Sequence, residues 1–342
     1  MPAADADVLV VSLGATGGLR AADDELVASL RRAGASVAMA CAAPPREVRT
    51  LALTDLGWAL AAREAARAGI HRSRPRAVVY SSSTAALLAP QPGAIRFDAP
   101  AAGNRPGRHG IWQRPAERRR FASAALLVPW SSGALEESPG PHAAAVVVPV
   151  PVEPSGPPGQ ARDIAAVTYG ANPRKKGLDR VLAAWAAAGR TGERLVVAGI
   201  TATEVERVLG ARAAATAGVS FAGGMEHAAY RALLRRSRVF VTGVRREDYG
   251  IAQLEALVDG CRLVTTAPRG PYAALELART LDERLVGDDL AAGLRVALSD
   301  PSTGYAERAR ELTMPWRRAQ VDRIVAERLL PRLLEPANPA VA

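Results

Sequence analysis

The chain has 342 residues, of which 49% are hydrophobic and 23% are charged, and this composition is typical of a globular protein with apolar residues for two domain cores. It excludes a disordered or fibrous chain, and Arg, Asp or Pro interrupts every apolar stretch well short of the roughly 18 residues of a membrane span. The net charge of +10 leaves open a role for an anionic partner.

The beginning of the chain and its cysteines indicate where the protein resides. Residues 1–15 have neither the basic start nor the long apolar core of a secretory signal. Cys41 and Cys261 lie far apart within apolar runs, which favours two buried free thiols over a disulfide or a metal site. We therefore expect a protein of the reducing cytoplasm.

The first 150 residues alternate between strand-like and helical patterns. The apolar run at 7–13 is followed by a glycine-rich turn at 14–18, a helical pattern from about Ala22 to Gly34, and a second apolar run at 36–43. This order is that of the first unit of a doubly wound sheet. The elements expected after it are helices at 56–68, 84–88 and 115–124 and strands at 76–83, 94–100, 125–130 and 145–150.

A segment rich in Pro and Gly at 151–163 cannot be a core element and marks a linker. The second alternating series after it has predicted strands at 164–170, 194–200, 219–224, 238–243 and 262–267, and predicted helices at 177–188, 203–217, 226–236, 250–258 and 271–279. A helical tail at 305–334 follows, and in two-domain α/β enzymes such a tail commonly crosses back to the first domain. The sequence thus predicts an α/β protein with two Rossmann-like domains, 1–150 and 164–304, whose cleft at the carboxyl ends of both sheets binds the ligand.

The strongest functional pattern is REDYGIAQLEA at 246–256. Glu247 precedes a predicted helix, and Glu255 lies about a turn and a half inside it. A loop carboxylate can reach a sugar hydroxyl while the helical one reaches a ribose diol. Free amides near Tyr249 and Gly250, at the positive end of the helix dipole, would bind negative charge.

This segment resembles the E-x7-E signature of the retaining GT-B glycosyltransferases of family four (glycosyl transferases group 1), with EDYG where those proteins have E-G-F-G. The strand and glycine loop at 259–275 are similar to those of the family as well. The resemblance implies two Rossmann-like domains facing a central cleft, a C-terminal donor domain, and a C-terminal helix that crosses back to the first domain. The residues that it places at the donor are Glu247, Asp248, Tyr249, Gly250 and Glu255.

A basic turn within 168–185 is similar to the family's G-R-x4-K-G element, with Lys176 and Gly177 at the family lysine and glycine. Lysines at a strand-to-helix junction neutralise a diphosphate, so Lys176 is expected to bind the leaving group. One departure is Ala171, which stands where the family has an arginine, so half of the usual phosphate clamp is absent. The candidates to replace it are Arg174 and Lys175. A solvated basic turn is the alternative interpretation.

Three glycines are further candidates for the donor site. Gly14 and Gly17 belong to the turn after the first strand, where backbone can approach phosphates closely. A dinucleotide fingerprint is the competing interpretation of this turn, but no acidic residue ends the second strand. Gly199 ends a strand, and 219–223 resembles the family's V-x-F-x-G element, which holds the nucleotide base.

The segment 94–120 supplies candidates on the acceptor side. Asp98 ends a strand where many relatives carry a His-Asp pair, and Phe97 stands in place of the histidine. His109, in a predicted open loop, is the second candidate to contact the donor sugar, and a surface-loop histidine is the alternative. Trp112 could rest at a lipid interface, stack on a sugar ring or anchor its loop.

Charge is concentrated between residues 71 and 120, which hold ten arginines and only two acids. A solvated basic face is one interpretation, and a surface for an anionic membrane, lipid phosphate or nucleic acid is the other. No nucleic-acid motif is present, which makes nucleic acid the weaker partner. The ten are Arg72, Arg74, Arg76, Arg96, Arg105, Arg108, Arg114, Arg118, Arg119 and Arg120.

The resemblance implies transfer of a hexose from a nucleoside-diphosphate sugar to an acceptor hydroxyl with retention, in glycan, glycolipid or cell-envelope biosynthesis. The sequence has no Cys/His metal cluster, so neither a metal nor another cofactor is expected. The expected partners are the nucleotide sugar and a glycan or lipid-linked acceptor, at the inner face of the membrane if the basic segment binds it. A sugar epimerase of the same fold and a non-catalytic nucleotide-sugar binder are the alternatives.

Overall fold

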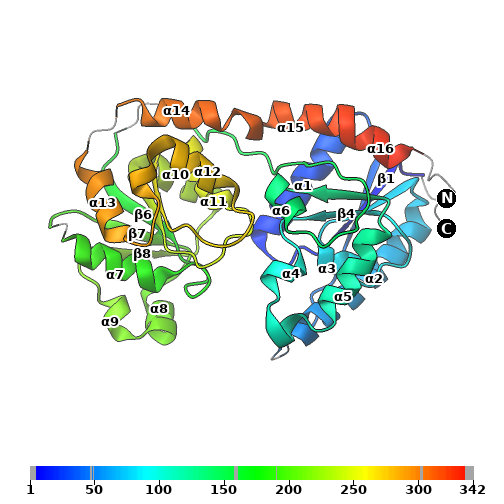
Figure 1. The fold of residues 1–342 in the computed structure, drawn as a ribbon, viewed down its shortest axis with the longest axis horizontal. Coiled ribbons are helices and arrows are strands. Elements are labelled where there is room, and N and C mark those ends of the chain that lie inside the picture. The colour runs from blue at the N-terminus through cyan, green and yellow to red at the C-terminus, as the bar shows by residue number, and fades with distance from the viewer. Residues whose placement is uncertain are drawn as a thin grey trace. The chain divides into compact units, whose positions relative to one another are not determined.

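The computed structural model describes residues 5–46, 48, 50–157, 161–189, 191–300 and 303–335. The chain divides into two compact units (Figure 1). Unit 1 comprises residues 1–151 and 318–342, and unit 2 comprises residues 152–317. Each unit contains a parallel five-stranded sheet with helices around it, which confirms the predicted α/β class.

The sheet of unit 1 has the strand order β2-β1-β3-β4-β5, and its strands pair in parallel. This order places β1 between β2 and β3, so that the chain reverses direction across the sheet at β1, as in a doubly wound sheet. The elements are β1 (Val8–Ser12), α1 (Gly17–Arg32), β2 (Val37–Cys41), α2 (Leu51–Ser73), β3 (Ala77–Tyr80), α3 (Ser83–Ala86), β4 (Ala94–Phe97), α4 (Ala101–Asn104), η1 (Gly107–Gly110), α5 (Gln113–Ala122), β5 (Leu126–Pro129) and α6 (Ser132–Glu136).

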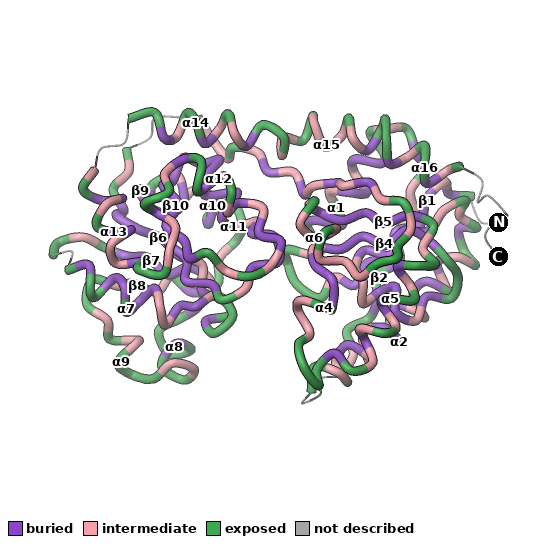
Figure 2. Tube along the Cα trace, viewed as in Figure 1, coloured by how far each residue is buried: buried purple, intermediate pink, exposed green. Residues whose placement is uncertain are grey.

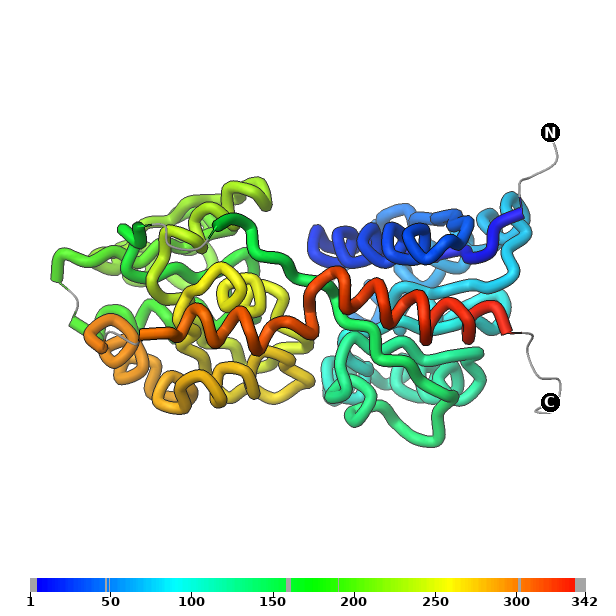
Figure 3. The backbone as a smooth tube through the Cα atoms, turned by 90° about the horizontal axis from the view of Figure 1, so that it is seen from above, coloured from blue at the N-terminus to red at the C-terminus, as the bar shows by residue number. Residues whose placement is uncertain are grey.

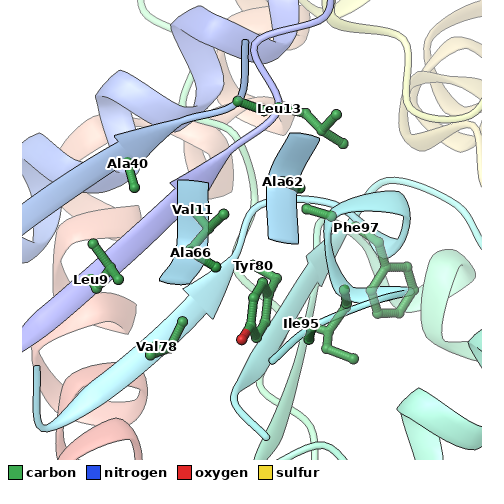
Figure 4. Packing of buried hydrophobic residues seen from close by; sticks show 14 of the residues in the cluster. Leu9, Val11, Leu13, Ala40, Ala62, Ala66, Val78, Tyr80, Ile95 and Phe97 are labelled. Atoms are coloured by element: carbon green, nitrogen blue, oxygen red, sulfur yellow. The ribbon is translucent and has the colours of Figure 1, made fainter. Parts of the chain in front are cut away.

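Alternate residues of β1 enter two separate cores, one on each face of this sheet. Leu9 and Val11 join the cluster that includes Ala62 and Ala66 of α2 (Figure 4). Val8 and Val10 join the other cluster, which includes Leu26 and Leu30 of α1. Because successive side chains of a strand point to opposite faces, a continuous apolar run is the pattern of a strand covered on both sides.

The end of the chain completes the core of unit 1. After α14 (Tyr305–Leu312) and η3 (Met314–Trp316) of unit 2, the segments α15 (Arg318–Ile324), η4 (Val325–Leu329) and α16 (Leu330–Leu334) run beside α1 (Figure 3). Val325 and Leu329 are buried in the α1 cluster. Asp322 accepts hydrogen bonds from Ser29 Oγ at 2.5 Å and from Arg32 Nε at 2.8 Å. The tail predicted at 305–334 is therefore shared between the two units.

The sheet of unit 2 has the strand order β10-β9-β6-β7-β8, again entirely parallel. Its central strands are almost wholly buried (Figure 2), as expected for a sheet covered by helices on both faces. The elements are β6 (Ile164–Tyr169), α7 (Leu178–Ala188), β7 (Leu195–Ala198), α8 (Ala202–Leu209), α9 (Ala211–Ala214), β8 (Val219–Gly223), α10 (His227–Arg236), β9 (Ser237–Thr242), α11 (Ile251–Val258), β10 (Arg262–Thr265), α12 (Ala273–Asp282), η2 (Glu283–Leu285) and α13 (Leu290–Ser299).

Some predicted elements differ from the structure. Residues 145–150 do not form the predicted strand. The amides of Val146 and Val148 donate to the carbonyl oxygens of Leu127 and Pro129 in β5, but Pro149 has no N–H and the segment makes only an isolated bridge at Ala145. The first helix begins at Gly17, five residues before the prediction, because the Thr16 side chain accepts the amide of Leu19 as an N-cap.

Two further predictions are corrected. The helix expected at 203–217 is divided into α8 and α9 at Gly210, whose φ of 93° interrupts the helical backbone. Both cysteines are free, as expected, but Cys41 is exposed at the end of the edge strand β2 and only Cys261 is buried. No helix in the described ranges is both long and apolar enough to cross a membrane.

Candidate active site

The loop between β9 and α11 and the helix that follows it each carry one carboxylate at the carboxyl end of the unit 2 sheet. Glu247 lies in the loop and Glu255 in the helix, and both are buried. Gly250 precedes the helix with a φ of 91°, and a Cβ there would lie 2.6 Å from the ring of Tyr272. Only glycine satisfies both conditions, so the loop has a fixed path.

A second loop, between β6 and α7, brings a lysine to Glu247. The Nζ of Lys176 lies 2.9 Å from Oε2 of Glu247. Gly177 follows with a φ of 62°, and a Cβ there would lie 1.9 Å from the carbonyl oxygen of Gly243. The two loops therefore approach each other closely. The sequence analysis treated them as two separate motifs and did not predict this contact.

A second ion pair joins the same two loops. Asp248 is buried and accepts a hydrogen bond from Lys175 Nζ at 3.4 Å and from Arg246 Nε at 2.8 Å. Arg174 lies at the surface, and its Nη2 donates to the carbonyl oxygen of Val208 at 3.3 Å. Of the two residues proposed to replace the missing arginine, only Lys175 is therefore bonded to the carboxylates of this site.

Two residues that the sequence analysis did not name contact Glu255. The Nε2 atom of His227 lies 2.6 Å from Oε1 of Glu255, and Nη1 of Arg231 lies 3.6 Å from it. The hydrogen bond to Glu255 raises the pKa of His227, while burial acts in the opposite direction. Arg231 is buried and also donates to Asp259 at 2.8 Å. The sequence could have indicated His227 and Arg231 as site residues, because they follow directly after 219–223, the segment that resembles the base-binding element.

Gly199 lies where β7 ends, beside the position of the missing arginine. With a φ of 85°, a Cβ on Gly199 would lie 2.8 Å from the ring of Tyr169 and 3.2 Å from Cβ of Ala171. Its amide donates to the carbonyl oxygen of Gly223 at 2.7 Å. The backbone of β7 is thus held against the ends of β6 and β8.

Tyr249 contributes its side chain to the interior of unit 2. Its ring is buried, and its hydroxyl accepts a hydrogen bond from Trp316 Nε1 at 3.0 Å. Its carbonyl oxygen accepts the amide of Ala273 at 3.1 Å. The EDYG loop is therefore anchored to two other parts of unit 2 through one residue.

Residues 158–311 match the family model described as glycosyl transferases group 1. This part of the chain is a group 1 glycosyltransferase domain. It contains both loops and all of the ion pairs described above. No curated protein matches the chain.

Solved structures share the fold of the chain. WaaG, a glycosyltransferase involved in lipopolysaccharide biosynthesis, has 16% identity and a TM-score of 0.69 over 94% of this chain and 99% of its own. Sucrose-phosphate synthase from Thermosynechococcus elongatus has 15% identity and a TM-score of 0.70, over 93% and 94%. HepE of Anabaena, in complex with UDP and glucose, has 12% identity and a TM-score of 0.69, over 94% and 98%. At these identities the likeness shows a common fold, GT-B.

The candidate residues in unit 1 lie on separate elements. Gly14 has a φ of 55°, and its carbonyl oxygen accepts Arg20 Nη1 at 2.7 Å. Gly17 is the first residue of α1. Asp98 is half-buried and accepts the amide of Ala99 at 2.9 Å, and His109 is exposed in η1.

Arg96 belongs to a buried polar cluster instead of the predicted basic face. It is only 1% exposed, lies 3.5 Å from Asp23, and stacks on the ring of Trp130 at 4.7 Å. Ser12 Oγ donates to Asp23 at 2.5 Å. Burial raises the pKa of Asp23, against the effect of the neighbouring guanidinium. The sequence pattern could not find this cluster, because its members come from β1, α1, β4 and the residue after β5.

Other arginines of the basic segment are also bonded within unit 1. Arg105 Nε donates to Asp55 at 2.7 Å, and Arg120 donates to the carbonyl oxygens of Leu87 and Ala89. The exposed members of the segment are Arg72, Arg74, Arg76, Arg108, Arg118 and Arg119. Arg74 and Arg76 are paired with Asp5 and Asp7. The basic face is therefore smaller than the composition indicated.

Among the described residues, no group of three His, Cys, Asp or Glu side chains is placed to hold a metal ion.

Proposed function

We propose that unit 2 binds a nucleoside-diphosphate sugar and that the protein transfers its hexose to an acceptor hydroxyl with retention of anomeric configuration, without a metal. The observation that carries this proposal is the contact of Lys176 with Glu247 at 2.9 Å. It places a cation suited to a diphosphate beside a carboxylate suited to sugar hydroxyls, between the ends of two strands. Glu255 would hold the ribose, one and a half turns further along α11.

The chemistry asks for stabilisation of a departing diphosphate. The donors available for this are Lys176, Lys175 and the first amides of α11, which have no partner within the helix. Donors that are oriented before the reaction are usually the largest source of stabilisation for developing negative charge. If the acceptor attacks from the face that the diphosphate leaves, a phosphate oxygen takes its proton. The protein then needs to orient the reactants and requires no nucleophile of its own.

A nucleoside diphosphate is the donor class that we favour, and HepE, which shares the fold, was solved with UDP and glucose. Lys176 and Lys175 each face a carboxylate, at 2.9 and 3.4 Å. A bound diphosphate would draw both ammonium groups toward itself and leave Glu247 able to accept sugar hydroxyls.

We further propose a glycan or lipid-linked acceptor and binding of unit 1 to the inner face of an anionic membrane. Arg108, Arg118 and Arg119 are exposed, and Ile111 between them is 69% exposed. Basic and apolar side chains together are what an anionic lipid surface attracts. Flotation with vesicles of neutral lipid and with vesicles containing an anionic lipid tests this, and equal flotation would contradict it.

A second candidate is a nucleotide-sugar-binding protein without transferase activity. Ala171 at the family's arginine position favours it, since this removes one of the cations that stabilise the leaving diphosphate. Such a protein would bind the donor as proposed but would release no nucleoside diphosphate.

The test is thermal stabilisation by UDP, GDP, ADP, TDP and their sugar conjugates, with Glu255→Ala and Lys176→Ala beside the wild type. We expect a selective shift with one nucleotide that both variants lose. Release of that nucleoside diphosphate from its sugar conjugate on addition of an acceptor extract then separates a transferase from a binding protein. No shift with any conjugate would contradict the donor site.

A further inference from the structure

One buried side chain within the segment 246–256 was given no role by the sequence analysis. Gln253 lies in the first turn of α11 and is 1% exposed. All the residues that follow it in the helix are buried, and all but Glu255 are apolar: Leu254, Ala256, Leu257 and Val258. A buried amide in such a helix requires a polar partner.

That partner is Glu247. The Nε2 atom of Gln253 donates to Oε2 of Glu247 at 3.0 Å, the same oxygen that lies 2.9 Å from Nζ of Lys176. A carboxylate can only accept hydrogen bonds, so the amide nitrogen must face it. Two donors on one oxygen fix the direction of the carboxyl group, and the other oxygen, Oε1, receives neither of them.

The geometry of the helix explains why this residue reaches the loop. Side chains in an α-helix incline toward its N-terminus, so a long side chain in the first turn covers the segment before the helix. Gln253 is the third residue of α11, and a Cβ on Gly250 would lie 3.3 Å from its Oε1. The side chain therefore lies directly beneath the EDYG loop.

From these contacts we propose that Gln253 is a positioning residue for Glu247: it holds the carboxylate in the direction in which it accepts hydroxyls of the transferred sugar. This rests on the proposed function and deepens it. Because Gln253 acts through Glu247, its effect falls on the sugar part of the donor and on the transfer step. The nucleotide, held by other residues, is bound as before.

A length-matched substitution separates positioning from packing. Gln253→Met keeps the length of the side chain but cannot donate a hydrogen bond. The chain also offers a matched control: Gln113 in unit 1 is 2% exposed and donates to the buried carboxylate of Asp55 at 3.1 Å. Gln113→Met thus removes the same kind of bond within unit 1.

The experiment uses the full chain and the nucleotide sugar that stabilises it most. Dissociation constants for the nucleoside diphosphate and initial rates of its release are measured for wild type, Q253M, E247Q, the double variant and Q113M. We expect Q253M to lower kcat/KM for the donor by about tenfold or more, the usual effect of losing a hydrogen bond to a charged group. Nucleoside diphosphate affinity should stay within about twofold, and Q113M should match wild type in both.

The double variant decides the mechanism. If Gln253 acts through Glu247, Q253M has little further effect in the E247Q background. Multiplying effects, or an equal loss of nucleoside diphosphate and sugar-conjugate binding, would overturn the proposal and leave Gln253 a packing residue. An active wild type with a silent Q253M would overturn this inference alone. A wild type that binds no nucleotide sugar would overturn the proposed function, and this inference with it.

Discussion

The buried carboxyl group of Glu117 in α5 should make the stability of the protein depend on pH near neutrality. Its carboxylate is 1% exposed and accepts the amide of Ala101 at the start of α4, at 2.7 and 3.0 Å. Burial raises its pKa from 4.5 to about 7, although hydrogen bonds from Ser83 and Ala101 and the charge of Arg105 act in the opposite direction. Between pH 4.5 and about 7 the folded protein therefore holds a proton on Glu117 that the unfolded chain has released.

The sign and size of the effect follow from proton linkage. Between pH 4.5 and about 7 the folded state binds more protons at Glu117, so the free energy of unfolding falls as pH rises through this range. This shift of the Glu117 pKa lowers the free energy of unfolding above pH 7 by about 3 kcal/mol relative to its value below pH 4.5. Glu117→Gln removes the titration and keeps an oxygen that can accept the amide of Ala101. We expect the variant to equal wild type near pH 4.5 and to exceed it by up to about 3 kcal/mol at pH 8.

The assay is urea unfolding of the full chain at about pH 5 and pH 8, with the difference between variant and wild type compared at the two values. Glu64→Gln, at an exposed position of α2, is the control for removing a negative charge, and its difference should not change in the same way. An equal difference for Glu117→Gln at both pH values, or a larger loss of stability at pH 8, would refute the reasoning.

Three further predictions concern unit 2. The protonated imidazole of His227, whose pKa is raised, competes with a ribose for the carboxylate of Glu255. Nucleotide affinity should therefore increase from about pH 6 to pH 8 in wild type and much less in His227→Gln, and calorimetric titration at both pH values checks this. Lys176→Met should weaken nucleoside diphosphate binding by about tenfold or more, and Lys175→Met by less because that side chain is 54% exposed; equal losses would contradict the assignment. Gly177→Ala should destabilise by about 3 kcal/mol or more, because its Cβ would overlap a backbone carbonyl, whereas Gly18→Ala, with open space around it, should be neutral or stabilising in thermal unfolding.

Local patterns were sufficient for the order of the elements and for the two principal motifs. The run at 164–170 predicts a buried strand because it is apolar apart from Thr168, and β6 occupies Ile164–Tyr169. Periodicity was not sufficient for 145–150, an apolar run in which Pro149 interrupts strand pairing. The start of α1 was missed because the capping role of Thr16 outweighs the poor helix propensity of Gly17 and Gly18.

The sequence by itself determined the α/β class, the presence of two sheets, and the lysine and glutamates that form the candidate donor site. Only the tertiary structure decided which groups pair there. Lys176 is 71 residues from Glu247, and His227 is 28 residues from Glu255. It also decided that Arg96 is buried against Asp23 instead of lying on a basic face. Hydrophobic periodicity reports only which side of an element faces the core, whereas ion pairs between loops depend on which strands become neighbours in the sheet.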